Sequence, residues 1–406
     1  MLAAELEAAA GAFRLRLALE VEEGRTLVLF GPSGAGKSLL LRAVAGVHRP
    51  VWGRITLDGR PLLDSARGVD VPPQARRLGY VPQNYALFPH LTVNQNVAFG
   101  LRGLPGAERH RRVDDLLAQL QLEGLAQRRP AQLSGGQQQR VAIARALATE
   151  PRVLLLDEPF AALDAPLRRV LRRELHTLRH RFGFAALLVT HDLGDACALG
   201  DAIAVVVGGE IVQLGSPQEV LTRPATPLVA RLTGLRNVFP GRVARVLDGA
   251  LEVQTARFLA RTPPYPFPAG AGVHLYVRPD AVSLVRPGHE PPWQQPQRPD
   301  AQGLTAEGPT GATLLRGRIV DEQHLGALHT LYFRLTETAV PLDTPFGIGA
   351  SGVPLARTGA EHDLEVDIAA HPYQALGVAK QREWTLALLP LALHVTGATP
   401  LARSGW

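Results

Sequence analysis

Short, almost entirely apolar runs recur through the first half of the chain, at residues 26–30, 153–157 and 186–190. Strands of a parallel sheet that is covered on both faces have this composition. Between the last two runs, residues 163–180 are long enough to form the helix that crosses from one parallel strand to the next. The pattern therefore predicts an α/β domain built on a parallel sheet.

Segments with the alternating pattern of strands or the periodicity of helices lie before and between these apolar runs. Further strands are predicted at residues 13–21, 53–59 and 78–83, and a helix closed by glycine at residues 39–46. From residue 84 to about 129 the pattern is helical, and five leucines share one predicted apolar face: Leu116, Leu117, Leu120, Leu122 and Leu125. The sequence thus predicts a helical subdomain, about residues 84–135, inserted in the α/β domain.

The pattern changes near residues 235–240, where proline and glycine become frequent and short alternating strands replace long helices. We place a domain boundary there, with domains 1–235 and 236–406. Two Gly-Arg segments, residues 239–246 leading to 273–284 and residues 315–320 leading to 363–372, resemble each other and predict a duplicated small β-barrel. Residues 286–309 are rich in Pro, Gln and Gly and predict a mobile loop.

Charge and cysteine content narrow the possible partners. The 406 residues include 43 Lys and Arg against 37 Asp and Glu, which is a mild basic excess. No basic stripe interleaved with aromatic residues is present, so we expect no nucleic-acid partner. Basic pairs such as Arg168 and Arg169 are expected on solvated helix faces or at an anionic membrane surface. The single Cys197 excludes an internal disulfide and a cysteine-based metal cluster.

Hydropathy indicates whether the chain is expected to cross a membrane or to be secreted. No apolar run reaches the length of a bilayer, and the longest candidate, residues 386–395, is interrupted by Pro390. Residues 1–10 carry two Glu, no basic residue and no long apolar core, so no secretory signal is expected. The cytoplasm is the predicted compartment.

A glycine-rich loop follows the first apolar run. Residues 31–38 fit the phosphate-binding pattern of two glycines four residues apart, followed by Lys37 and Ser38. Glycine lets backbone N–H groups turn toward phosphate oxygens, the lysine adds positive charge, and the serine hydroxyl suits Mg²⁺. The predicted ATP-binding residues are Gly31, Pro32, Ser33, Gly34, Ala35, Gly36, Lys37, Ser38 and Leu39. The alternative is a glycine-rich turn that only links a strand to a helix.

A second glycine turn precedes another helix, at residues 133–137. Ser134 is a good helix N-cap, and the glycines beside it expose N–H groups at the positive end of that helix. One nucleotide needs only one such cradle, so we expect this turn to face the phosphate loop of a second copy in a homodimer. The residues predicted to bind ATP across the dimer are Ser134, Gly135, Gly136, Gln137 and Asp164. An ordinary glycine-containing helix start remains the alternative.

Polar side chains end three of the predicted strands. Asp157 and Glu158 follow one apolar run, and His191 follows the next. Since ligands bind at the carboxyl ends of parallel strands, we predict that Asp157 holds Mg²⁺ and Glu158 polarises the attacking water. His191 is expected to contact the γ-phosphate, and Gln83 to reach Mg²⁺ or the water. The predicted catalytic residues are Glu158, His191 and Gln83, and the predicted metal ligands are Ser38, Gln83 and Asp157.

Taken together, residues 1 to about 235 resemble the nucleotide-binding subunit of an ABC transporter, with the phosphate loop, Gln83, residues 133–137, Asp157-Glu158, Asp164 and His191 in the family's order. The resemblance implies a P-loop NTPase (ABC ATPase) domain with a helical insertion that binds ATP and Mg²⁺. It implies a homodimer attached to two membrane permease subunits and, through them, to a solute-binding protein, at the cytoplasmic face of the membrane. It also implies that residues 85–91 contribute to the groove that receives the permeases.

Residues 236–406 resemble, more loosely, the mostly β, OB-like accessory domain of importers for oxyanions, polyamines, iron and sugars. Residues 79–90, with 72–77 before them, are most similar to the molybdate and sulfate group. We therefore expect an importer ATPase for molybdate or a related oxyanion. The alternatives are the same role for sulfate, iron, polyamine or sugar, and a non-transport ABC ATPase, which would normally carry two cassettes or a DNA-binding insertion.

The chain departs from many relatives in one respect. The aromatic residue that stacks on adenine, roughly two dozen residues before the phosphate loop in those relatives, is replaced by the alanines at positions 8–10. Phe13 is the nearest aromatic residue and lies within a predicted strand. Adenine stacking is therefore left unassigned.

Overall fold

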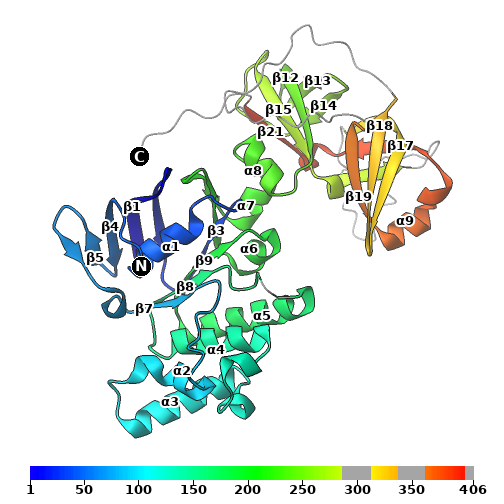
Figure 1. Ribbon diagram of the computed structural model, residues 1–406. Coiled ribbons are helices and arrows are strands. Elements are labelled where there is room, and N and C mark those ends of the chain that lie inside the picture. Colours follow the sequence, from blue (N-terminus) through cyan, green and yellow to red (C-terminus); the bar gives the residue numbers. More distant parts are fainter. Residues whose placement is uncertain (162, 286–311, 337–361, 398–406) are drawn as a thin grey trace, which may run out of the picture. The chain divides into compact units, whose positions relative to one another are not determined.

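The computed structural model describes residues 1–161, 163–285, 312–336 and 362–397 (Figure 1). It divides into two compact units, Met1–Leu221 and Thr222–Trp406. The sequence predicted a boundary later in the chain, near residue 235. The structure divides the chain earlier because α8 (Pro227–Leu232) and Leu235 belong to the second unit, where Ala230 and Leu235 form a buried cluster with Tyr276. The loop predicted at residues 286–309 lies outside the described residues.

The first unit is organised around a six-stranded sheet. In sheet order its strands are β11 (Glu210–Gly215), β10 (Ala202–Val207), β3 (Thr26–Phe30), β9 (Ala185–Thr190), β8 (Val153–Asp157) and β7 (Leu78–Val81). All neighbours run parallel except β11, which is antiparallel to β10. Every residue of β3, β8 and β9 is buried, as the apolar runs predicted. The carboxyl ends of β3, β9, β8 and β7 therefore meet at one edge of the sheet (Figure 1).

A second, antiparallel sheet lies across helix α1 from the first. Its strands in sheet order are β2 (Phe13–Val21), β1 (Leu2–Ala10), β4 (Trp52–Leu57), β5 (Arg60–Asp64) and β6 (Val69–Asp70). α1 (Lys37–Ala45) shares one apolar core with both sheets and ends at Gly46, which has φ 78°. Strand β1 was not predicted, although its apolar residues alternate and Leu2 and Leu6 are buried.

The helical subdomain follows β7. It contains α2 (Val93–Ala98), α3 (Gly106–Gln119) and α4 (Gly135–Leu147), and α2 packs against both α3 and α4 (Figure 1). The predicted apolar face was wrong in its length. α3 ends at Gln119 and Gln121 takes φ 56°, so Leu120 and Leu122 pack from the connection after the helix and Leu125 from a short 3-10 helix. The first unit also contains α5 (Ala165–Phe182) and α6 (Leu193–Leu199), and α7 (Pro217–Thr222) ends at the boundary between the units.

The second unit consists of two five-stranded antiparallel sheets around one core. The first contains β14 (Leu259–Thr262), β13 (Ala250–Thr255), β12 (Asn237–Leu247), β15 (Gly272–Val277) and β21 (Leu393–Gly397). The second contains β16 (Val282–Val285), β20 (Glu383–Leu388), β17 (Thr313–Leu325), β18 (Leu328–Leu335) and β19 (Leu364–Ala369), followed by α9 (Ala370–Leu376). This is the OB-like, mostly β domain that the sequence predicted.

The two sheets share features that a duplication would produce. β12 and β17 both carry a Gly-Arg pair, and both are bulged just after it, at Val243 and at Ile319. The predicted end of the second copy was wrong: residues 363–372 form β19 and the start of α9, whereas the match of β15 and β16 is β20 and β21. The copies also exchange their last strands, because β16 pairs with β20 and β21 pairs with β15.

Short 3-10 helices connect several elements, at Pro73–Ala75, Phe99–Leu101, Glu123–Leu125, Pro130–Gln132, Pro279–Ala281, Val378–Lys380 and Pro390–Ala392. Within the described part of the chain, no helix combines the length and the apolar character needed to cross a bilayer.

Candidate active site

The phosphate loop joins the end of β3 to the start of α1. Gly31 has φ 155°, and a Cβ there would lie 2.1 Å from the Val206 carbonyl oxygen, so no other residue fits the present backbone. Gly36 has φ 93° and its missing Cβ leaves room for the ring of Phe13, the first residue of β2. The sequence therefore needs glycine at these positions for two separate reasons, backbone conformation and close packing.

Lys37 closes this loop on itself. Its Nζ donates hydrogen bonds to the carbonyl oxygens of Gly31 and Pro32, both at 2.8 Å, and the residue is 4% exposed. Burial lowers the pKa of Lys37, and the nearby carboxylates of Glu158 and Asp157 partly offset this. The ammonium group thus lies inside the loop, next to the backbone that would surround a phosphate.

Ser38 and Asp157 meet at the edge of the sheet. The Ser38 hydroxyl donates to Asp157 Oδ1 at 2.7 Å, and Asp157 is 1% exposed. Burial raises the pKa of Asp157, and the hydrogen bond from Ser38 acts in the opposite direction. Hydroxyl and carboxylate oxygens are ligands that suit Mg²⁺, and a magnesium site normally uses few protein ligands together with phosphate oxygens. In the described residues no cluster of three or more His, Cys, Asp or Glu side chains is placed to hold a metal ion by itself.

The side chains of the other two predicted catalytic residues, His191 and Gln83, lie close to the Glu158 carboxylate. Its Oε2 lies 3.2 Å from His191 Nδ1 and 3.5 Å from Gln83 Nε2. The three residues follow β8, β9 and β7, which are neighbours in the sheet (Figure 1). Glu158 has φ 46°, a left-handed conformation that is uncommon for glutamate, and its N–H donates to the Val189 carbonyl oxygen at 3.0 Å. The structure therefore brings these residues together at one carboxylate.

The second glycine turn caps α4. Ser134 accepts from the N–H of Gln137 at 3.4 Å, and the Gln137 side chain accepts from the N–H of Ser134 at 3.0 Å, which completes a capping box. Gly136 packs closely against α5, because a Cβ there would lie 2.6 Å from the end of the Leu167 side chain, which would have to move. The first N–H groups of a helix have no partner within it. Gly135 and Gly136 therefore present such groups at the positive end of α4.

Asp164 caps the neighbouring helix α5 by accepting from the N–H of Leu167 at 2.9 Å. The residues predicted to act across a dimer thus lie at the starts of two adjacent helices. Within the part of the chain that the structure describes, no hydrogen bond links Ser134 or Asp164 to the phosphate loop.

An ion-pair network that the sequence did not predict fixes the turn after His191. Arg168 donates to Asp192 at 2.8 Å, and Arg172 donates to Asp192 at 3.1 Å and also pairs with Asp195. Of the basic pair expected on a solvated helix face or at an anionic membrane surface, Arg169 is exposed, but the expectation was wrong for Arg168, which is partly buried in this network. The spacing of two arginines four residues apart on α5 was the available signal.

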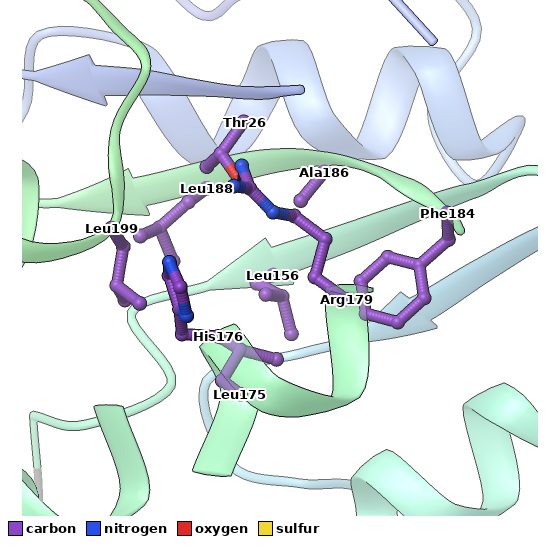
Figure 2. Close-up of a pocket in the computed structure, with 9 residues that line it drawn as sticks. All are labelled: Thr26, Leu156, Leu175, His176, Arg179, Phe184, Ala186, Leu188 and Leu199. Atoms are coloured by element: carbon purple, nitrogen blue, oxygen red, sulfur yellow. Dashed lines mark hydrogen bonds between the residues drawn. The ribbon is translucent and has the colours of Figure 1, made fainter. Parts of the chain in front are cut away.

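A small cavity lies elsewhere, under α5 on the face of the sheet away from α1 (Figure 2). Its volume is about 10 Å³, and it is lined by Thr26, Leu156, Leu175, His176, Arg179, Phe184, Ala186, Leu188 and Leu199. A space of this size holds about one water molecule. It is too small for a nucleotide and lies away from the polar residues at the strand ends.

Comparison of the sequence with those of known proteins identifies its family. The ABC transporter family matches residues 15–161. The spermidine/putrescine import ATP-binding protein of Marinobacter nauticus is 44% identical over 68% of this chain and 73% of its own length. The sulfate/thiosulfate import ATP-binding protein of Xylella fastidiosa is 47% identical over 66% and 75%, and the molybdate/tungstate import ATP-binding protein of Thermococcus kodakarensis is 42% identical over 67% and 79%.

Among solved structures, the chain is similar to an ATP-binding cassette described as dimeric, in a post-hydrolysis state with ADP and Pi bound. The sequences are 33% identical, the match covers 53% of this chain and 99% of that chain, and the TM-score is 0.47. Because the import ATP-binding relatives are more than 40% identical over more than two thirds of their own length, this chain belongs to the ABC transporter family, as an importer-type ATP-binding subunit.

Proposed function

We propose that this chain hydrolyses ATP with Glu158 as the general base and works as a homodimer that drives uptake of molybdate or a related oxyanion. The observation that carries the mechanism is the convergence of Gln83 and His191 on the Glu158 carboxylate, beside Asp157 and the phosphate loop. A carboxylate in this place can accept a proton from water while the neighbouring amide and imidazole orient the reacting groups.

The phosphate loop supplies the binding side of this mechanism. In our proposal, Lys37 leaves the carbonyl oxygens of its own loop and donates to the β- and γ-phosphates, while Gly31–Leu39 surround them with backbone N–H groups. Ser38 and Asp157, with Gln83 close by, would hold Mg²⁺. When bound, Mg²⁺ neutralises part of the phosphate charge. His191, which is half exposed, is free to reach the γ-phosphate while Glu158 holds the water.

The dimer is inferred from the second helix start. Ser134, Gly135, Gly136, Gln137 and Asp164 form a group suited to an anion, but the phosphate loop of the same chain already provides a phosphate site without them. A second copy related by a two-fold axis would place each group on the partner's ATP. We further propose that two permease subunits hold this dimer at the cytoplasmic face of the membrane and receive solute from a binding protein.

Membership of the family does not identify the transported solute, so the oxyanion is a separate part of the proposal. Relatives named for spermidine/putrescine, sulfate/thiosulfate and molybdate/tungstate import are all 42–47% identical to this chain. The proposal of an oxyanion is supported by the resemblance of residues 72–77 and 79–90 to the molybdate and sulfate group, which favours that group without excluding the others. The test is to search the neighbouring genes for a solute-binding protein and to titrate that protein with molybdate, sulfate and spermidine by calorimetry. Tight binding of spermidine alone would replace the oxyanion with a polyamine.

The mechanism is tested by Glu158→Gln. The amide keeps the size of the side chain but cannot accept the proton, and a general base contributes about a hundredfold to ten-thousandfold to a rate. We expect ATPase activity to fall by at least about a hundredfold while ATP still binds and a dimer accumulates on gel filtration. Glu150→Gln, at a side chain that is 65% exposed, is the matched control and should keep the wild-type rate. Undiminished turnover in Glu158→Gln would remove the assigned base.

A further inference from the structure

The segment after Gln83 has an unusual backbone. Tyr85 and Ala86 have φ 60° and 43°, so two consecutive residues with a Cβ take the left-handed conformation that glycine normally supplies. Short turns accompany this geometry, with the Tyr85 N–H donating to the Pro82 carbonyl oxygen at 2.8 Å and the Ala86 N–H to that of Asn84 at 2.7 Å. Such a backbone persists only where neighbouring contacts hold it.

Arg145 provides those contacts from the last turn of α4. Its guanidinium group donates to the carbonyl oxygens of both strained residues, to Ala86 at 2.7 Å and to Tyr85 at 2.9 Å. It also lies over the ring of Phe88, 5.4 Å from the ring centre, and Phe88 packs against Phe99. A planar donor with two parallel N–H groups matches two consecutive carbonyls, which an ammonium group does not.

The far end of the same segment is fixed separately. The buried Asn96 of α2 accepts from the Phe88 N–H at 2.9 Å and donates to the carbonyl oxygens of Phe88, Leu91 and Thr92. Residues 88–92 are therefore anchored without Arg145. The part that depends on Arg145 is the stretch directly behind Gln83, and Gln83 is 3.5 Å from the Glu158 carboxylate.

We infer that Arg145 is a positioning residue for Gln83: it ties the backbone behind Gln83 to the helix that begins with the Ser134 turn. A shift of α4 at its first turn is then transmitted to the side chain beside the general base. This inference rests on the proposed function, because it assigns Gln83 a place in the reaction. Arg145 itself contacts no reacting atom.

The test compares Arg145→Gln with Arg140→Gln in the full-length chain. Arg140 lies on the same helix but pairs with the Glu174 side chain of α5, so its loss leaves residues 84–86 untouched. In Arg145→Gln we expect amide hydrogen exchange of Tyr85 and Ala86 to rise at least about tenfold, with exchange in α1 unchanged. We expect kcat for ATP hydrolysis to fall about tenfold to a hundredfold with KM for ATP unchanged, since displacement of a group from its working position has this effect. Arg145→Lys should retain the charge without restoring kcat.

Amide exchange and kcat together distinguish failure of this inference from failure of the proposed function. Unchanged exchange at Tyr85 and Ala86 in Arg145→Gln would overturn the inference, as would a wild-type kcat in that variant. Equal losses in Arg140→Gln would also overturn it, because a general weakening of α4 would then explain both variants. If the wild-type protein hydrolysed no ATP, the proposed function would fail, while the exchange experiment would still decide whether Arg145 holds this backbone.

Discussion

His394 joins two distant segments of the second unit, and its environment makes a pH-dependent prediction. It lies on β21, where its Nδ1 accepts from the Tyr265 hydroxyl at 2.9 Å and its Nε2 donates to the Pro224 carbonyl oxygen at 3.3 Å. These partners suit the neutral ring with its proton on Nε2. Burial lowers the pKa of His394 from 6.5 to about 4, and Arg223 acts in the same direction.

The lowered pKa of His394 determines how its contribution to folding stability changes with pH. Between pH 4 and 6.5 the unfolded chain binds a proton at His394 that the folded chain does not, so stability rises with pH across this window. One pKa unit corresponds to about 1.4 kcal/mol, which gives about 3 kcal/mol for the full window. Because His394 is only partly buried, we expect about 2 to 3 kcal/mol of stability to be lost as the pH falls from 7 to 4.

The comparison that isolates this contribution is wild type against His394→Gln. Glutamine offers a donor for the Pro224 carbonyl and an acceptor for the Tyr265 hydroxyl but does not titrate. Free energies of opening from amide exchange in β15 and β21, measured at pH 7 and pH 4.5, report on this sheet. Other groups titrate in both proteins and cancel in the difference. A pH dependence of the same size in both proteins would refute the reasoning.

Two further predictions concern the phosphate loop. In Gly31→Ala the new Cβ would lie 2.1 Å from the Val206 carbonyl oxygen, so the loop must move, and we expect a lower melting temperature and at least about tenfold weaker binding of a fluorescent ATP analogue; binding and melting like those of wild type would contradict the assigned conformation. Ser38→Ala leaves the buried Asp157 carboxylate without its hydroxyl donor, so the free energy of unfolding should fall by about 1 to 3 kcal/mol in urea titrations, and ATPase activity should need more Mg²⁺. An unchanged Mg²⁺ requirement would exclude Ser38 as a ligand.

Much of the first unit could be predicted because short stretches of sequence are enough to indicate its strands and the polar residues that follow them. The strands that carry the site are buried on both faces, so they appear in the sequence as continuous apolar runs, and the polar residues at their ends identify the edge where ligands bind. β1 was missed because its inward positions alternate between leucine and alanine, a weak amphipathic signal. α3 ended early because Gln121 adopts a left-handed conformation that its residue type does not announce.

The parts that could not be predicted depend on contacts between segments far apart in the chain. The exchange of β16 and β21 between the two sheets leaves the strand pattern of each copy unchanged, since either partner sheet accepts an alternating strand. The same limitation applies to the arginines. Arg145 is a polar residue on a helix, and nothing in the sequence shows that it donates to Ala86. The spacing of Arg168 and Arg172 places both on one face of α5, but it does not identify Asp192 as their partner.

The pairing of site residues within the free chain has an energetic consequence for ATP binding. Lys37 already donates to two carbonyl oxygens, Ser38 to Asp157, and Glu158 already faces Gln83 and His191. A nucleotide therefore exchanges existing hydrogen bonds for new ones, and its affinity reflects only the difference between the two sets. The N–H groups at the start of α4 are different, since a helix cannot satisfy them itself. Contact of a partner's nucleotide with that exposed helix start would replace hydrogen bonds to water rather than hydrogen bonds within the protein. In our proposal, closure of the dimer is therefore the step in which binding energy becomes available to move the rest of the transporter.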